Sequence, residues 1–229
     1  MGNLCFILTI LVTFFSGCGG EVYRERVEAT THYFRRLEDR NQLLSKDVWN
    51  SESISFRVPL RFVPFLDENN APRPPLPLDV PGLLGSWKGR LSLEKTATEK
   101  DAFLYLADSQ RASDEDKKIG DFEQTSIERI ATTLGIEPKT ILQSRTSTKF
   151  PNKPGVVDQV EYVFYRFEIP DSIANFEEAY QAYLFFHKAT QRKILILFLI
   201  PKDLSSDSKQ RTRRALSFSL ESLVVREQL

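Results

Sequence analysis

Apolar residues recur at helical spacing in the segment that begins at residue 21. Between residues 21 and 49 the apolar side chains are Tyr23, Val27, Phe34, Leu37, Leu44 and Val48. Charged residues of both signs lie between them, so the pattern predicts an amphipathic helix over 21–49. We expect this helical arm to pack on its own domain, to hold the domain away from a membrane, or to self-associate.

After Ile54 the period changes to two. Ile54, Phe56, Val58 and Leu60 alternate with polar residues and Pro59, which predicts a half-buried strand at a sheet edge. The following segment, 64–82, contains six prolines in the run PFLDENNAPRPPLPLDVP. Such a segment is neither a regular helix nor a central strand, and we predict a stiff Pro-rich surface loop.

The remaining elements are more regular. Alternation and turn residues predict strands at 85–95, 102–109, 141–150, 156–170, 180–189 and 193–201, and helical spacing predicts helices at 122–134 and 208–226. Gly135 is the expected stop of the first of these helices. The run ILILFLI, 194–200, is apolar at every position, as expected of a strand that is covered on both faces.

Strands and helices are partly segregated along the chain, which indicates an α+β fold. We expect an antiparallel sheet of about five to seven strands flanked by helices on both faces, with an N-terminal helical arm and a C-terminal helix. Residues 51–229 would form a single domain. This order of elements, from Ile54 to Val225, resembles the PsbP-like α-β-α sandwich found among small lipoproteins and photosystem accessory proteins.

The first eighteen residues, MGNLCFILTILVTFFSGC, have the order of a secretory leader: an apolar run, two small residues and a cysteine. They resemble the lipobox signal peptide of bacterial lipoproteins. That resemblance implies a signal peptide over 1–17, cleavage between Gly17 and Cys18, and a lipidated N-terminus and arm over 18–50. Fatty acids such as palmitate on Cys18 would anchor the protein in the cell envelope, facing the periplasm or the exterior.

Three other interpretations of the leader remain open. They are a transmembrane anchor, ordinary secretion with an unmodified Cys18, and N-myristoylation at Gly2 with palmitoylation of Cys5. Phe15 stands where lipoboxes usually have an aliphatic residue, and residues 1–3 carry neither Lys nor Arg.

Composition excludes several classes of protein. Beyond the leader Cys18 has no second cysteine to pair with, so neither an intrachain disulfide nor a zinc-thiolate site is expected. Lys plus Arg equals Asp plus Glu at 31 each, a balance unlike that of nucleic-acid-binding proteins. Arg211, Arg213 and Arg214 form the one dense basic cluster, which we interpret as a solvated helix face.

Catalytic motifs are not recognisable. The two histidines, His32 and His187, offer no paired metal-ligand spacing, and no nucleophile elbow or phosphate-binding loop occurs. Ser92 and Lys95 have S-x-x-K spacing without the partner motifs of acyl enzymes. The acidic residues Asp114, Glu115, Asp116 and Asp121 lack the spacing of a calcium loop and read as a solvated loop. We therefore predict no catalytic, cofactor-binding or metal-binding residue.

The sequence thus favours a lipid-anchored, non-enzymatic cell-envelope protein that binds or positions another envelope component. The arm or the Pro-rich loop would contact an envelope protein. One alternative is an envelope hydrolase that uses carboxylates among Asp158, Glu161 and Glu168. A second is a carrier of an apolar ligand, with a cavity lined by phenylalanines.

Overall fold

The structure is a computed structural model that describes residues 19–51, 53–74, 76, 78–93, 98–114, 121–137, 141–169, 179–189 and 192–226. The chain divides into two compact units. The first contains the residues up to Gln42 together with Lys149–Gln159, and the second contains Leu43–Thr148 and Val160–Leu229.

The first unit is built from helix α2, Gly19–Leu43, and the tip of a β-hairpin. The hairpin turns at Gly155, whose φ of +78° is readily adopted by glycine. The prediction that the first helix reaches residue 49 is wrong, because α2 ends at Leu43. The next residue, Leu44, is fully buried and pairs with Pro59 in an isolated β-bridge, which requires extended backbone.

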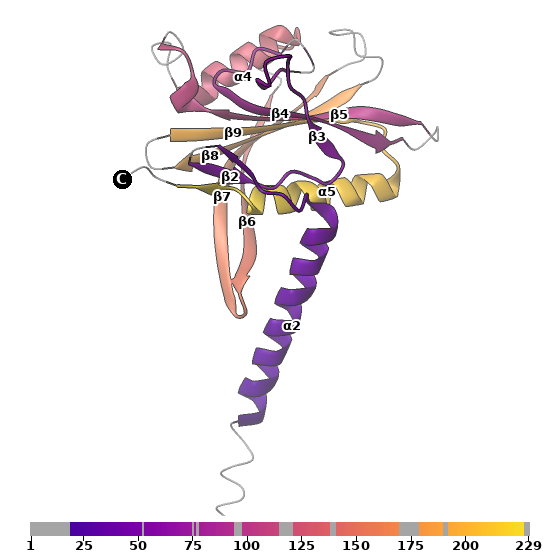
Figure 1. The fold of residues 1–229 in the computed structure, drawn as a ribbon, viewed down its shortest axis with the longest axis vertical. Helices are drawn as coiled ribbons and strands as arrows, with labels where there is room; N and C mark the ends of the chain where they lie inside the picture. Colours follow the sequence, from indigo (N-terminus) through magenta and orange to yellow (C-terminus); the bar gives the residue numbers. More distant parts are fainter. Residues whose placement is uncertain are drawn as a thin grey trace, which may run out of the picture. The chain divides into compact units, whose positions relative to one another are not determined.

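The second unit contains a seven-stranded antiparallel sheet (Figure 1). The predicted α+β class and strand number are confirmed. In spatial order the strands are β3 (Phe62–Pro64), β4 (Leu83–Ser92), β5 (Glu99–Asp108), β9 (Arg192–Pro201), β8 (Tyr180–Ala189), β7 (Val156–Ile169) and β6 (Leu142–Lys153). The short 3₁₀ turn η1, Ser109–Arg111, follows β5.

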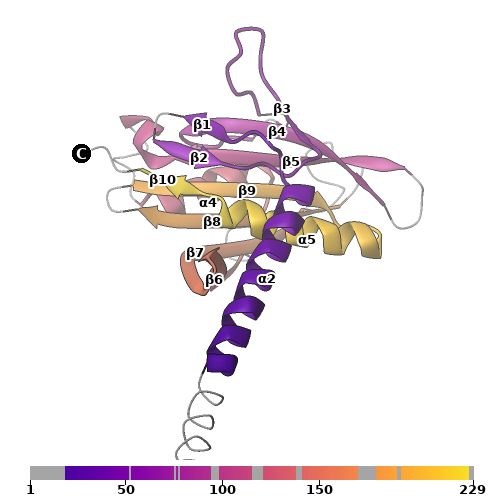
Figure 2. The same cartoon turned by 60° about the horizontal axis from the view of Figure 1, so that its bottom comes forward.

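A second, three-stranded sheet was not predicted. It consists of β1 (Trp49–Ser51), β2 (Ile54–Phe56) and β10 (Val224–Val225), with β2 in the centre (Figure 2). The single strand predicted from Ile54 to Leu60 is therefore shorter, because the chain leaves β2 at Arg57. The Arg57 amide donates to the hydroxyl of Ser222 instead of continuing a ladder.

The C-terminal helix is also shorter than predicted. Helix α5 spans Ser206–Glu221, and the backbone then pairs Val224 with Ser55 and Val225 with Ile54. Helix α4, Phe122–Thr133, agrees with the prediction of a helix over 122–134. The carboxylate of Asp121 caps its N-terminus, and Gly135, at a φ of +65°, follows its C-terminus.

Two clusters of buried side chains form the core of the second unit. One contains Leu104, Leu106, Ile196 and Phe198 of the sheet with Leu216 and Leu220 of α5. The other contains Phe103, Tyr105, Leu195 and Leu197 with Ile127 and Ile130 of α4. The two clusters take alternate residues of β5 and β9, as the two-residue period of a strand requires.

The Pro-rich segment is partly built into the second of these clusters. Leu78 and Val80 are buried in it, while residues 68–71 are exposed. Gly82 ends the segment with a φ of +66°, and a side chain there would meet the carbonyl oxygen of Asp108. The segment is thus an irregular connection whose last third packs on the sheet.

Candidate functional site

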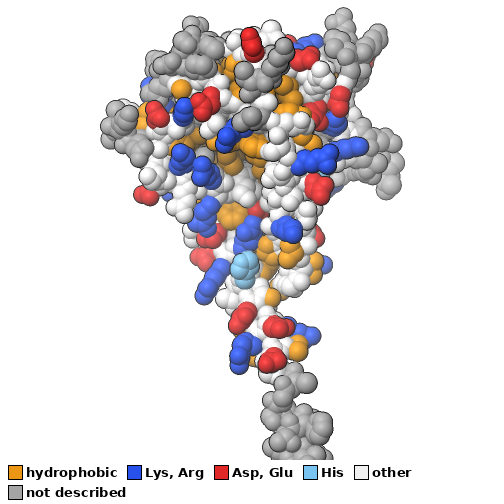
Figure 3. Space-filling model, turned by 180° about the vertical axis from the view of Figure 1, so that it is seen from behind, with side chains coloured by type: hydrophobic (Ala, Val, Ile, Leu, Met, Phe, Trp, Pro, Cys, Tyr) orange, Lys and Arg blue, Asp and Glu red, His pale blue; other side chains and the backbone are white. Residues whose placement is uncertain are grey.

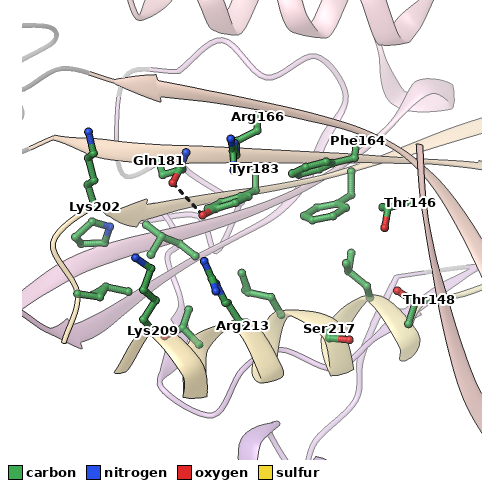
Figure 4. A pocket seen from close by; sticks show the side chains of 17 residues that line it. Thr146, Thr148, Phe164, Arg166, Gln181, Tyr183, Lys202, Lys209, Arg213 and Ser217 are labelled. Atoms are coloured by element: carbon green, nitrogen blue, oxygen red, sulfur yellow. Dashed lines mark hydrogen bonds between the residues drawn. The ribbon is translucent and has the colours of Figure 1, made fainter. Parts of the chain in front are cut away.

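A groove with a volume of about 440 Å³ lies between α5 and the adjacent part of the large sheet (Figure 4). This volume falls in the range of small-molecule sites, roughly 300–1,000 Å³. Its walls come from β6, β7, β8, the end of β9 and α5, all within the second unit. The lining residues are Thr146, Thr148, Phe164, Arg166, Gln181, Tyr183, Phe185, Ile200, Pro201, Lys202, Leu204, Lys209, Thr212, Arg213, Leu216, Ser217 and Leu220.

The antiparallel register of β7 and β8 builds the sheet side of the groove. Phe164 lies opposite Phe185, and Arg166 lies opposite Tyr183. Because residues two apart on a strand share a face, these four side chains project toward the same side of the sheet. The Phe164–Phe185 pair forms the aromatic end of this wall, and the Arg166–Tyr183 pair forms its polar end.

The aromatic rings of the groove form a stack. The ring centroids of Phe164 and Phe185 are 4.8 Å apart, with 26° between the ring planes. The Phe164 and Tyr183 rings are 6.1 Å apart and nearly parallel, at 15°. Stacked rings of this kind present a flat apolar surface that suits an aromatic or aliphatic group.

Helix α5 forms the opposite wall. Lys209, Arg213, Leu216 and Leu220 follow one another at intervals of four, three and four residues, so they share one face of the helix. Lys209 and Arg213 rise from the helix toward the sheet (Figure 4). The stripe that faces the groove is therefore cationic in its first half and apolar in its second.

The charges that line the groove are mainly positive. The amine of Lys202 lies 2.8 Å from the carboxylate of Glu168. Arg166, Lys209 and Arg213 are exposed and have no ion-pair partner within the described ranges of the chain. Three of the four cations that line the groove therefore have no carboxylate as an ion-pair partner among the described residues, and the fourth is paired with Glu168.

Tyr183 is the ionisable group that these cations influence. Burial raises the pKa of its phenol above the ordinary value of 10.0; Arg213 and Arg166 oppose the rise, and the Glu168 carboxylate adds to it. The hydroxyl remains neutral at physiological pH and donates to the side-chain oxygen of Gln181 over 3.1 Å. The site thus offers hydrogen bonds and positive charge.

The candidate residues that the sequence singles out either lie away from the groove or fall outside the described residues of the chain. The predicted cleavage and lipidation residues, Gly17 and Cys18, fall outside the described residues. His32 lies on α2. His187 lies on β8, with its ring centroid 5.6 Å from that of Tyr162 and Nδ1 3.2 Å from the carbonyl oxygen of Glu161.

The carboxylates considered for a hydrolase do not form a pair on the sheet. Glu161 and Glu168 are seven residues apart on β7, which corresponds to about 23 Å and to opposite faces of the strand. Asp158 belongs to the hairpin tip of the first unit. Glu168 instead forms the ion pair with Lys202.

The S-x-x-K pair and the acidic residues of the loop do not form a site among the described residues. Ser92 ends β4, whereas Lys95, Glu115 and Asp116 fall outside the described residues. Asp121 caps α4 and binds the amine of Lys193, and Asp114 is exposed. Across the described ranges, no group of three or more His, Cys, Asp or Glu residues could hold a metal ion.

Sequence reasoning missed the groove, although one signal for it was present. Arg213, which the sequence assigns with Arg211 and Arg214 to a solvated helix face, is exposed and also lines the groove. Its spacing from Leu216 and Leu220 places it on the apolar stripe of the helix rather than on the polar face. Only the three-dimensional fold shows that this stripe of α5 and Arg166 of β7 line the same groove.

The comparisons with known proteins give little further information. No protein-family model and no curated protein matches the chain. One similar solved structure is a crystal structure at 1.50 Å from Bacteroides thetaiotaomicron VPI-5482, with 10% sequence identity and a TM-score of 0.35. The alignment covers 79% of this chain and 48% of that one, so the chain spans about half the length of this neighbour.

The surface carries charges of both signs. On the face drawn in Figure 3, Lys and Arg side chains are interspersed with Asp and Glu, which agrees with the zero net charge of the sequence. Among the helices in the described ranges, none has both the length and the apolar composition needed to cross a membrane.

Proposed function

We propose that this chain is a lipid-anchored, non-enzymatic cell-envelope protein whose folded domain binds a small ligand with an apolar body. The groove between α5 and the sheet is the observation that carries the proposal. It joins the stacked rings of Phe164 and Phe185 to the apolar half of α5, and its volume is that of a small-molecule site. This choice develops the carrier hypothesis, because two phenylalanines line the cavity.

The anchor in this proposal is a lipid on Cys18, with the signal peptide removed after Gly17. The protein then faces the periplasm or the exterior, and α2 lies between the lipid and the domain in the sequence. The leader sequence supports this part of the proposal. The arm and the Pro-rich loop remain the proposed contacts for an envelope protein.

The proposal includes a large sheet that is covered by helices on both faces. The two core clusters support this arrangement, since they take alternate residues of β5 and β9 and each contains leucine or isoleucine side chains of a different helix. Side chains then fill the centre of the sandwich. A ligand is accommodated at the groove, where β6, β7 and β8 face α5.

Photoaffinity labelling tests the proposal. The full chain, in nanodiscs of zwitterionic lipid, is incubated with a diazirine-bearing decanol and irradiated, and the labelled residues are mapped by mass spectrometry. We expect saturable labelling of residues that line the groove. Excess unmodified decanol should remove it.

The matched variants are Thr146→Trp and Ser147→Trp. Thr146 lines the groove, whereas Ser147 follows it on β6 and projects to the other side. We expect Thr146→Trp to abolish groove labelling and Ser147→Trp to retain it. Labelling that neither substitution changes, or that does not saturate, would overturn the proposed function.

A further inference from the structure

The groove combines an apolar surface with an excess of positive charge. Arg166, Lys209 and Arg213 line it without an ion-pair partner in the described part of the second unit, and Lys202 lines it with Glu168 as its partner. Like charges that share a site repel one another, and an anion bound among them would relieve that repulsion. The arrangement favours a negatively charged ligand.

The two arginines line the groove from opposite walls. Arg166 is directly opposite Tyr183 in the strand register, and Arg213 lies on α5. One guanidinium group comes from the sheet and the other from the helix, so both walls of the groove carry a cation. Guanidinium groups bind carboxylates and phosphates through paired N–H donors.

The apolar surface begins beside these cations. Phe164 is two residues from Arg166 on β7 and stacks with both Tyr183 and Phe185. On α5, Leu216 follows Arg213 by three residues. A molecule whose charged end lies between the arginines therefore has its apolar part against the phenylalanines and the leucines of α5.

We infer that the ligand of this groove is an amphiphilic organic anion, with a carboxylate or phosphate head bound by Arg166, Arg213 and Lys209 and an apolar body on Phe164 and Phe185. The inference rests on the proposed function and specifies its ligand class. Both sources of negative charge, a carboxylate and a phosphate monoester, share the chemistry that the arginines recognise.

The experiment compares probes with one body and different heads. The full chain in zwitterionic nanodiscs is labelled with diazirine-bearing decanol, and decanoate, decyl phosphate and decanol compete at pH 7.4. We expect the better of the two anions to compete at least about tenfold more strongly than decanol, because a guanidinium group forms a stronger, charge-assisted hydrogen bond with an anion than with a hydroxyl. The preference should diminish at high salt.

Charge variants locate the head group. We expect Arg213→Gln and Arg166→Gln each to reduce competition by the anions about tenfold and to leave decanol unchanged. Arg211→Gln is the matched control, because it removes a nearby exposed arginine of α5 that does not line the groove.

The outcomes separate this inference from the proposed function. Equal competition by decanol and both anions, or anion competition that Arg213→Gln and Arg166→Gln do not change, would overturn the inference and leave the apolar site intact. Absence of saturable groove labelling by the diazirine-bearing decanol would overturn both. Preference for decyl phosphate over decanoate, or the reverse, identifies the head group and supports the inference.

Discussion

Arg192 and Asp108 form a buried ion pair at the point where β5 ends and β9 begins. The guanidinium Nη1 lies 3.3 Å from the carboxylate Oδ2, and the two side chains are 10% and 5% exposed. A second guanidinium nitrogen of Arg192 donates to the hydroxyl of Ser53 over 2.8 Å. The pair therefore joins the large sheet to the segment that precedes β2.

Removal of one partner of this pair should be strongly destabilising. In Arg192→Met the carboxylate of Asp108 stays buried without its counter-charge, and we expect the free energy of unfolding to fall by about 3 kcal/mol or more. The double substitution Asp108→Asn with Arg192→Met should recover part of that loss. Urea unfolding measures both.

Arg61→Met is the control for this experiment. Arg61 and Glu99 form an ion pair in which both side chains are about half exposed, 49% and 48%, so its loss should change the free energy of unfolding by less than about 1 kcal/mol. Equal effects of Arg192→Met and Arg61→Met would contradict the structural role of the buried pair.

The network at the start of α4 predicts a specific pH dependence. The hydrogen bond from Lys193 lowers the pKa of Asp121 below its ordinary 3.8, against the opposing effect of burial. A lowered folded-state pKa means that this stabilisation is complete above about pH 4 and is lost as the pH falls through the folded-state value. Asp121→Asn should therefore flatten the acid side of the stability profile while it retains the helix cap.

The basic side of the profile has the opposite sign. Burial acts to lower the pKa of Lys193, but Asp121 and Glu123 outweigh it and raise the pKa above 10.5. This contribution is complete below pH 10.5 and is lost as the pH rises through the folded-state value. Thermal unfolding across pH measures both limbs, and the exposed Asp203→Asn serves as the control. If Asp121→Asn loses stability at acid pH as the wild-type protein does, the acid-side pH dependence does not come from Asp121.

Two glycines allow backbone strain to be separated from a steric clash. Gly82 and Gly155 both have positive φ, but a Cβ on Gly82 would lie 2.2 Å from the carbonyl oxygen of Asp108, whereas one on Gly155 would meet nothing within 4 Å. We expect Gly155→Ala to lower the free energy of unfolding by about 1 kcal/mol and Gly82→Ala by more than about 2 kcal/mol. Chemical unfolding measures the free energy of unfolding of both variants. Equal losses in Gly82→Ala and Gly155→Ala would show that the steric clash at Gly82 does not contribute.

The anchor is tested by mass. If Cys18 is lipidated, wild-type protein from membranes should have the mass of residues 18–229 plus acyl groups, and Cys18→Ser should remain as the unmodified precursor. Intact-mass spectrometry distinguishes the two. A free thiol on Cys18 in the wild-type protein would show that the lipoprotein interpretation is incorrect.

Local patterns predicted the elements whose signals are local. Helix α4 was predicted from its apolar face, with Gly135 as the stop, and the strand that contains ILILFLI was predicted from its short, continuous apolar run. The errors involve distant partners. The chain after Glu221 is a strand because Ser55 and Ile54, nearly 170 residues earlier, pair with it. The groove depends on the register between β7 and β8, which the sequence does not reveal.

The pairing of β10 with β2 also determines when the domain can finish folding. Ile54 and Ser55 have no β10 partners until Val224 and Val225 have been synthesised. The small sheet therefore closes after translation of this region, not during it. Until then β2 can pair with β1 alone, and the small sheet lacks its third strand.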